Sequence, residues 1–262
     1  MDKEHKIAEF KLNTSSIQDG VYILSDIKND FESLYLKVRE KEKRIYSDVE
    51  LRLLPFASDD NIHKAEWNLR VQSFNRFKEY LNIKPENMNI LDLGCGNGWF
   101  YSQLSKTMNH NLFCVDINLA ELRQGSRVFN SNKLKFIYAD IFTVDFPIDC
   151  IDLITLNASI QYFPNFKRII DRLSGLLNDD GEIHIIDSPF YPENEINSAK
   201  QRTEEYYNSI GFSEMSQHYF HHSLKDLSAY NYEIQYKPNT LINKFKTMFF
   251  INDSPFPWIM IK

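Results

Sequence analysis

Short apolar runs alternate with stretches of helical periodicity through the middle of the chain. The runs predict strands at residues 89–93, 111–116, 134–138, 151–156 and 181–187. The stretches between them predict helices near residues 99–108, 119–129 and 165–177. A turn is expected at Asp179-Asp180-Gly181, before the fifth strand. Strands and helices that alternate in this way favour a parallel sheet built through right-handed crossovers.

The amino-terminal segment has a different pattern. Residues 1–30 show no clear period and contain a turn signal at Asp19-Gly20. Apolar residues at helical spacing predict one helix from Phe31 to about Arg44 and a second from about His63 to Leu81. We expect residues 1–84 to form a helical extension that packs over the sheet or roofs a ligand cleft.

The carboxyl-terminal segment continues the domain, which we place at residues 85–262 with inserts at about 192–230 and 238–255. A helix is expected at Pro192–Ile210, and strands are expected at 232–237 and 256–262. Apolar residues at helical spacing within 241–249 stand beside two lysines. Packing of this segment against the core or a partner subunit is favoured over contact with a membrane.

Composition narrows the class of protein. The 262 residues are 43% hydrophobic and 25% charged, which is typical of a globular protein. Residues 1–11 are charged and lack the apolar centre of a signal peptide, and no apolar stretch approaches the roughly 20 residues of a membrane span. Three cysteines stand singly, which predicts neither a disulfide nor a metal site and favours a cytoplasmic location.

Charge argues against a nucleic-acid partner. The net charge is −6, whereas binding to phosphate backbones needs a concentrated positive surface. The basic run at 37–44 is interrupted by Glu40 and Glu42, so it predicts a solvated helix face. We expect a monomer or homodimer. Aromatic residues make up 14% of the chain, which favours an apolar or aromatic small-molecule ligand.

The segment Asn89–Gly98 carries the most specific motif. An apolar strand runs into Asp92, and three glycines follow in the pattern Asp-x-Gly-x-Gly-x-Gly. A dinucleotide-binding turn requires Gly-x-Gly-x-x-Gly, but here Gly98 comes one residue too early and Trp99 takes the glycine position. A carboxylate beside the turn would repel a diphosphate, whereas it suits a ligand with an ammonium and a sulfonium group.

This pattern resembles motif I of the class I S-adenosylmethionine-dependent methyltransferases, and of their small-molecule members in particular. The resemblance implies an α/β fold with a Rossmann-like seven-stranded sheet, helices on both faces and a final antiparallel hairpin. It also implies S-adenosylmethionine as cofactor and no metal. The expected cofactor-binding residues are Asp92, Gly94, Cys95, Gly96, Asn97, Gly98, Asp116, Ile117, Asp140, Ile141, Asn157 and Ala158.

These residues are expected to contact different parts of the cofactor. Asp116 ends the second strand, where a carboxylate can accept hydrogen bonds from both ribose hydroxyls. The resemblance assigns the adenine amino group to Asp140 and the ring faces to Ile117 and Ile141. It places Asn157 and the following residue, Ala158, near the methionine portion.

The resemblance leaves the subgroup open. The chain lacks the Asn-Pro-Pro-Tyr type of motif found in methyltransferases of nucleic-acid amines. It has Gln161-Tyr162 where one small-molecule subgroup has two histidines.

A base for the acceptor is less well defined. Asp187, His221 and His222 are the candidates, whereas a structural role is expected for His184 within the fifth strand. Arg44 could fold back and pair with a cofactor carboxylate, although exposure to solvent is favoured for it.

We therefore expect transfer of a methyl group from S-adenosylmethionine to oxygen, nitrogen or carbon of a small molecule by in-line displacement. Two alternatives remain at this point. One is an NAD-linked oxidoreductase, and the other is a catalytically silent methyltransferase-like interaction protein.

Overall fold

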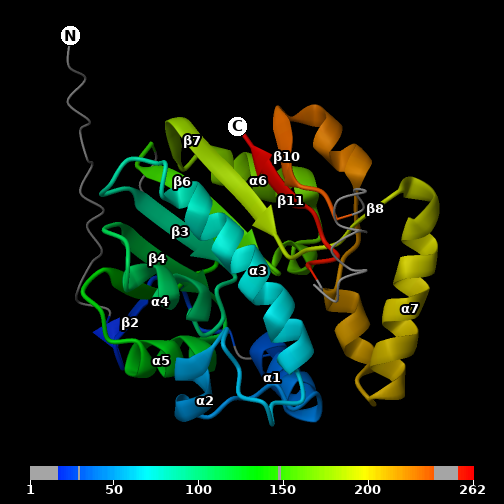
Figure 1. Ribbon diagram of the computed structural model, residues 1–262. Helices are drawn as coiled ribbons and strands as arrows, with labels where there is room; N and C mark the ends of the chain where they lie inside the picture. The colour runs from blue at the N-terminus through cyan, green and yellow to red at the C-terminus, as the bar shows by residue number, and fades with distance from the viewer. Residues whose placement is uncertain (1–16, 29, 147–148, 239–252) are drawn as a thin grey trace.

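A computed structural model describes residues 17–28, 30–146, 149–238 and 253–262, and its centre is a mostly parallel sheet (Figure 1). The described strands of this sheet lie in the order β1-β2-β5-β4-β3-β6-β7-β11-β10. Their bounds are β1 (Ile17–Gln18), β2 (Val21–Ile23), β3 (Asn89–Leu93), β4 (Asn111–Asp116), β5 (Leu134–Tyr138), β6 (Ile151–Asn157), β7 (Leu177–Ile186), β10 (Tyr232–Tyr236) and β11 (Trp258–Ile261).

The predicted strands are confirmed, and the five central ones pair in parallel. β11 runs antiparallel between β7 and β10, so the last two strands form the expected edge hairpin. The expected turn at Asp179-Asp180-Gly181 is wrong, because these residues lie inside β7. Leu177 pairs with Ile151 and Glu182 pairs with Leu153, so the intervening residues form an irregularity in the strand.

The sheet has nine described strands rather than the expected seven. The two additional strands, β1 and β2, form a hairpin around Asp19-Gly20. β2 pairs in parallel with β5, with Val21 opposite Phe136. Part of the amino-terminal segment therefore belongs to the sheet, and the division of the chain at residue 84 stays a prediction.

The predicted helices are also confirmed, with bounds shorter by a few residues at most ends. They are α1 (Asp30–Lys41), α3 (Lys64–Leu81), α4 (Trp99–Ser105), α5 (Leu119–Val128), α6 (Phe166–Ser174) and α7 (Ile196–Ser209). A short additional helix, α2 (Asp48–Leu53), begins at a capping box in which Ser47 and Glu50 bond to each other's backbone N–H groups. The apolar segment at 241–249 lies outside the described residues.

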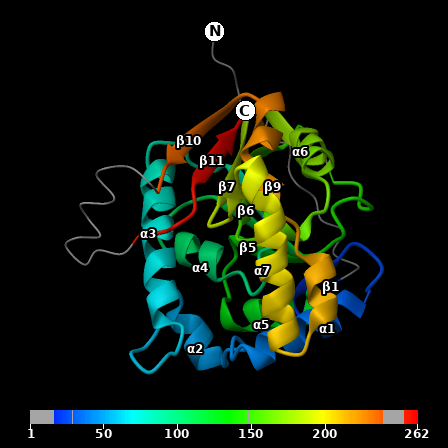
Figure 2. The ribbon, with the colours of Figure 1, turned by 90° about the vertical axis from the view of Figure 1, so that its right-hand side faces the viewer.

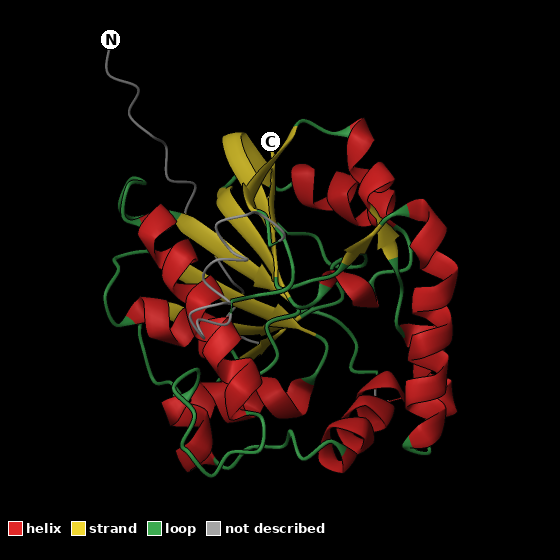
Figure 3. Ribbon diagram, turned by 45° about the vertical axis from the view of Figure 1, so that its right-hand side comes forward, coloured by secondary structure: helices red, strands yellow, loops and turns green. Residues whose placement is uncertain are grey.

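Helices cover both faces of the sheet (Figure 3). Apolar side chains form a core on each face. Helices α3, α4 and α5 cover one face, through buried residues that include Phe77, Phe100 and Leu122. Helix α6 covers the other face, through Ile169 and Ile170. Alternation along β3 serves both cores, because Ile90 faces the first and Leu91 the second.

Several segments lie outside the carboxyl ends of the parallel strands, where α7 stands in front in Figure 2. They are α1, α7, the 3-10 helices η2 (Ile160–Tyr162) and η4 (Ser213–His218), and the short parallel pair β8 (Phe190–Tyr191) and β9 (His222–Ser223). A small apolar cluster of Val38, Tyr207 and Met215 joins α1, α7 and η4. These segments form a roof over the edge of the sheet at which open α/β folds bind ligands.

Candidate active site

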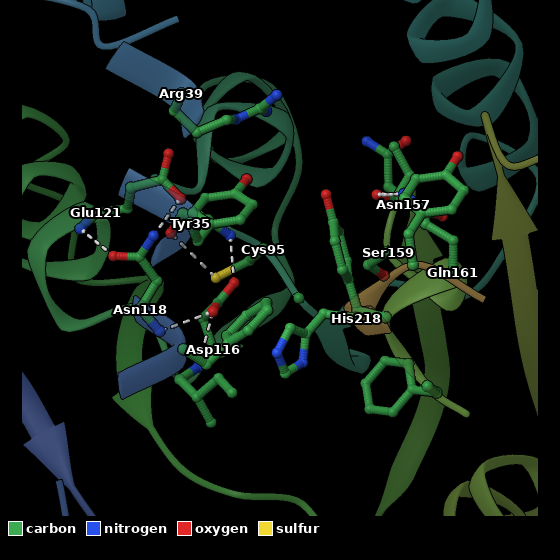
Figure 4. Close-up of a pocket in the computed structure, with 18 of the residues that line it drawn as sticks. Tyr35, Arg39, Cys95, Asp116, Asn118, Glu121, Asn157, Ser159, Gln161 and His218 are labelled. Atoms are coloured by element: carbon green, nitrogen blue, oxygen red, sulfur yellow. Dashed lines mark hydrogen bonds between the residues drawn. The ribbon is translucent and has the colours of Figure 1, made fainter. Parts of the chain in front are cut away.

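A cavity of about 700 Å³ opens between the carboxyl ends of the strands and this roof. Figure 4 shows its two sides, with Tyr35, Arg39, Asp116 and Glu121 on one and Asn157, Ser159 and Gln161 on the other. Ten of the twelve residues expected to hold the cofactor line this cavity, namely Gly94, Cys95, Gly96, Asn97, Asp116, Ile117, Asp140, Ile141, Asn157 and Ala158.

The glycine loop after β3 packs closely against the loop after β6. Gly94 has φ +75°, and a Cβ at this position would lie 2.5 Å from Cβ of Ser159. The Ser159 hydroxyl donates to the Leu93 carbonyl at 2.6 Å, which fixes the two loops together. Only glycine satisfies both the left-handed backbone and the close approach.

Asp116 ties the end of β4 to the same glycine loop. Its Oδ2 accepts from the Gly96 N–H at 2.7 Å, and its Oδ1 accepts from the N–H groups of Ile117 and Asn118 at 2.7 and 2.8 Å. Burial raises the pKa of this carboxyl, whereas the three backbone donors oppose that rise. A carboxylate offers about four acceptor positions, so about one remains for a ligand.

Glu121 is a second acid on this side of the cavity, and it was not predicted from the sequence. It stands in the first turn of α5, and its Oε2 accepts from the Asn118 amide at 2.9 Å. Burial raises its pKa to about 7, the Arg39 charge opposes this rise, and the neighbouring Asp116 charge adds to it. Its position five residues after Asp116, just behind the helix cap at Asn118, was the available signal.

The end of β5 contributes the third acid of the predicted set. Asp140 lines the cavity and forms an ion pair with Lys28 at 3.3 Å. Ile117 is 39% exposed in the cavity, and Ile141 is nearly buried beside Asp140. Apolar side chains therefore accompany a carboxylate at this end of the cavity.

The end of β6 places an unsatisfied acceptor at the cavity wall. Asn157 Oδ1 is buried and has no hydrogen-bond partner among the described residues. Ala158 follows with φ +53°, and its carbonyl accepts from the buried Gln161 amide at 2.6 Å. Because an unpaired buried oxygen is costly, this acceptor indicates a place for a donor from a ligand.

Asp92 and Gly98 do not line the cavity. Asp92 is 1% exposed, and its Oδ1 accepts from the Thr155 hydroxyl at 2.6 Å. The Tyr101 hydroxyl lies 2.9 Å from the same Thr155 oxygen, so the three side chains form a network beneath the glycine loop. Burial raises the pKa of Asp92 to about 7.

The three candidate bases also lie outside the cavity lining. The Asp187 Oδ1 accepts from the hydroxyls of Ser73 and Ser254, at 2.6 and 2.9 Å. His222 is buried with Nε2 3.0 Å from the Ile160 carbonyl, and His221 contacts the Thr203 hydroxyl at 2.9 Å. Desolvation by burial lowers the pKa of both histidines. The imidazole that does reach the cavity is His218.

His184 agrees with its expected structural role. It is fully buried, and its Nδ1 accepts from the Trp258 indole N–H at 3.0 Å.

The prediction of a solvated helix face at 37–44 is wrong for several of its residues. Arg39, Glu42 and Arg44 line the cavity instead, because the last turn of α1 and the residues after it lie against it. Arg44 donates to both Glu66 carboxylate oxygens, at 3.1 and 2.5 Å. Tyr35 lies one helical turn before Arg39, and this spacing of four was the signal that these two side chains share a face.

The lining fits a ligand that carries positive charge and hydroxyl groups, as S-adenosylmethionine does. Asp116, Glu121 and Asp140 supply carboxylates, and Asn157 Oδ1 supplies the unsatisfied acceptor. A Cβ on Gly96 would lie 3.1 Å from the Glu121 carboxylate, so the glycine leaves open the space between them.

Neither a metal-binding cluster nor a membrane-spanning helix is found in the described ranges. Residues 17–28, 30–146, 149–238 and 253–262 contain no cluster of three or more histidines, cysteines and acids arranged to hold a metal. None of the helices built from these residues has the length and apolar character needed to cross a membrane.

Comparison with known proteins agrees with this geometry. The family described as a methyltransferase domain matches residues 84–247. An uncharacterised methyltransferase of Mycobacterium bovis is 27% identical over 97 residues, which cover 37% of this chain and 49% of the relative. A malonyl-[acyl-carrier protein] O-methyltransferase of Ilyobacter polytropus is 32% identical over 106 residues, covering 40% of each chain. The chain thus spans half or less of the length of these relatives.

A solved structure shares the fold. The YcgJ protein from Bacillus subtilis aligns with a TM-score of 0.53 at 15% identity, covering 72% of this chain and 97% of that one. The sheet order, with a hairpin next to β7, and the family match over more than half of the chain lead to one assignment. The chain belongs to the methyltransferase domain family and has the class I methyltransferase fold.

Proposed function

We propose that the protein transfers a methyl group from S-adenosylmethionine to a small-molecule acceptor bound in the same cavity. The observation that carries this proposal is that a single cavity is continuous between two sets of residues. The predicted cofactor positions line one part of it, and aromatic side chains from α1, η2, α7 and η4 line another part. The cavity's volume of about 700 Å³ lies in the upper part of the range of about 300–1,000 Å³ that is usual for small-molecule sites.

Asp116 and Glu121 would share the cofactor's ribose hydroxyls. The three backbone donors on Asp116 leave it about one acceptor position, which is too few for two hydroxyls. Glu121 accepts a single side-chain hydrogen bond, from Asn118, and its carboxylate reaches the same glycine loop. Two neighbouring acids therefore replace the single carboxylate that the sequence motif implied.

Asp140, with Ile117 and Ile141, would hold the adenine, and Asn157 Oδ1 would accept from the ammonium group of the methionine portion. When bound, the cofactor supplies a methyl group already activated on a sulfonium centre. The task of the chain is then to align the two reactants, which can contribute about 7–11 kcal/mol through proximity and orientation. The roof formed by α1 and α7 would exclude water from this space.

The alternative functions make different demands on the site. An NAD-linked oxidoreductase needs the Gly-x-Gly-x-x-Gly turn for its diphosphate, whereas this loop has Trp99 at the position of the last glycine. An interaction protein of the same fold would bind the cofactor without consuming it. Only turnover separates that last alternative from the proposal.

A radiolabel experiment tests the proposal. The full chain is incubated with methyl-labelled S-adenosylmethionine and a cell extract separated by filtration into small molecules and macromolecules. We expect label in the small-molecule fraction, and much less of it with Asp116→Asn when the cofactor is held near the Kd of the wild type. Label in macromolecules alone would contradict the small-molecule acceptor, and binding of the cofactor without transfer to either fraction would favour the interaction protein.

A further inference from the structure

The roof side of the cavity carries a network of charged side chains. Arg39, Arg44 and Arg70 form a continuous chain of ion pairs with two carboxylates, those of Glu42 and Glu66. Three guanidinium groups face these two carboxylates, and the Arg39 charge also acts on the nearby Glu121, whose pKa it lowers against the effect of burial. All of these side chains line the cavity.

Arg39 is the member of this chain that is least well satisfied. Its sole ion pair among the described residues joins Nη1 to Glu42 at 3.3 Å, and its buried Nε has no partner there. Glu42 is also shared, because it accepts from the Tyr206 hydroxyl at 2.6 Å and lies 3.5 Å from Arg44. The Arg39 guanidinium therefore retains donors for a ligand.

Two phenol groups stand next to this guanidinium. The Arg39 guanidinium lies 5.2 Å from the centre of the Tyr35 ring, and the Tyr162 ring meets Tyr35 edge to face at 5.9 Å. Neither hydroxyl has a hydrogen-bond partner in the described part of the chain. Burial raises the pKa of both tyrosines, so each is protonated at neutral pH and can donate.

An aromatic wall continues from these two phenols. Phe31 lies 6.0 Å from Tyr35 and 6.2 Å from Tyr162, measured between ring centres, and 5.2 Å from His218. The Tyr219 ring extends the wall at 6.1 Å from Tyr162. Flat rings placed edge to face present the kind of surface that suits a planar molecule.

We propose that the acceptor is an aromatic or conjugated molecule bearing a carboxylate, which Arg39 and the hydroxyls of Tyr35 and Tyr162 bind while the aromatic wall holds its planar body. This inference rests on the proposed function, because it names the class of acceptor for the same cavity.

Charge favours the acceptor over the cofactor as the source of this carboxylate. The acids Asp116 and Glu121 gather at the glycine loop, whereas the guanidinium donors that Arg39 keeps free belong to α1 in the roof. An anion held on the roof side would face the positive end of the cofactor, and the two charges would attract each other. When a carboxylate oxygen itself takes the methyl group, the O–CH3 bond forms as the S–CH3 bond of the cofactor breaks, S-adenosylhomocysteine leaves and no proton is released. No base is then needed, which agrees with the placement of Asp187, His221 and His222 outside the lining.

Binding of matched probes tests the proposal on the full chain saturated with S-adenosylhomocysteine. Benzoate, cinnamate and 2-naphthoate are each compared with their neutral carboxamides by ligand-observed NMR. We expect at least one carboxylate to bind about tenfold or more tightly than its amide, as charged hydrogen bonds predict. Arg39→Met should remove this preference, and Tyr35→Phe with Tyr162→Phe should reduce it. Lys37→Met, at an exposed position on the same helix, should leave it unchanged.

The cofactor provides a second readout that also reports folding. Arg39→Met should leave the affinity for S-adenosylhomocysteine and for methylthioadenosine, which lacks the amino-acid carboxylate, within about twofold of the wild type. If Arg39→Met lost affinity for S-adenosylhomocysteine but not for methylthioadenosine, the proposal would be overturned, because Arg39 would then bind the carboxylate of the cofactor. No preference for any carboxylate, or a preference that survives Arg39→Met, would also overturn it. The proposed function would fail separately, through the absence of cofactor binding to the wild-type protein.

Discussion

The carboxylate of Asp116 accepts the backbone N–H of Gly96 at 2.7 Å, which joins the end of β4 to the glycine loop after β3. Neighbouring parallel strands place both at the same edge of the sheet. Asp116 therefore has two tasks in this account, since it shapes the loop and also faces the cavity.

Asp116→Asn should weaken binding of S-adenosylhomocysteine by about 1.5–3 kcal/mol, because the charged hydrogen bonds to the loop and to the ribose are lost. Calorimetric titration measures the change. Asp179→Asn is a matched control at an exposed position of β7 and should bind as the wild type does. An unchanged affinity in folded Asp116→Asn would remove Asp116 from the proposed cofactor site.

Gly94→Ala and Gly211→Ala form a matched pair for the glycine loop. Both glycines have positive φ, of +75° and +86°, but a Cβ at Gly94 would meet Ser159 at 2.5 Å whereas Gly211 has nothing within 4 Å. The left-handed backbone should cost each variant about 1–2 kcal/mol of unfolding free energy. Overpacking should cost Gly94→Ala about 1–3 kcal/mol more. Urea denaturation measures both changes. An equal loss of unfolding free energy in the two variants would contradict the prediction, because it would show that the loop moves to accommodate the added methyl group at residue 94.

Glu121 should make the ligand-free protein less stable as the pH rises. Its folded-state pKa of about 7 lies above the ordinary glutamate value, so the folded state binds more protons than the unfolded state between pH 4.5 and 7. Stability attributable to this group is therefore lost as pH rises through that window.

Glu121→Gln tests this sign. The shift sets an upper bound of about 3 kcal/mol, and solvent in the cavity reduces the expected gain of the variant at pH 8 to about 1–2 kcal/mol. Urea denaturation at pH 4.5 and pH 8 measures the difference, with exposed Glu79→Gln as control. Asp92, whose pKa is also about 7, contributes equally to both proteins. A variant less stable than the wild type at pH 8 would contradict this prediction.

Asp187→Ala should affect stability rather than cofactor affinity. The Asp187 carboxylate joins β7 to α3 through Ser73 and to the carboxyl-terminal segment through Ser254. Loss of both hydrogen bonds should cost about 1–3 kcal/mol of unfolding free energy. The affinity for S-adenosylhomocysteine should change by less than about twofold. Weaker binding of S-adenosylhomocysteine with an unchanged free energy of unfolding would contradict this prediction and would assign Asp187 to the cofactor site.

The sequence predicted the central sheet and most of the cavity floor for one physical reason. Parallel strands end at one edge, so Asp116, Asp140 and Asn157 had to meet there once the strands were located. The hairpin of β1 and β2 was not foreseen, because strands of two and three residues are too short to show a period.

The roof was harder to predict, because it depends on tertiary packing. Arg39 lies in a run of mixed charge that ordinarily faces solvent, and only the position of α1 against the cavity turns it inward. Asp187 shows the opposite case. It follows β7 at the expected edge, but its φ of +49° and its two serine partners belong to a path that directs the carboxylate toward α3.

Calorimetric titration of the full chain with S-adenosylmethionine, S-adenosylhomocysteine and NADH identifies the cofactor that this cavity binds. We expect saturable binding of the first two and no binding of NADH, because Trp99 stands where a dinucleotide-binding turn needs glycine. Binding of NADH, or failure of both S-adenosyl ligands to bind the folded protein, would contradict this expectation.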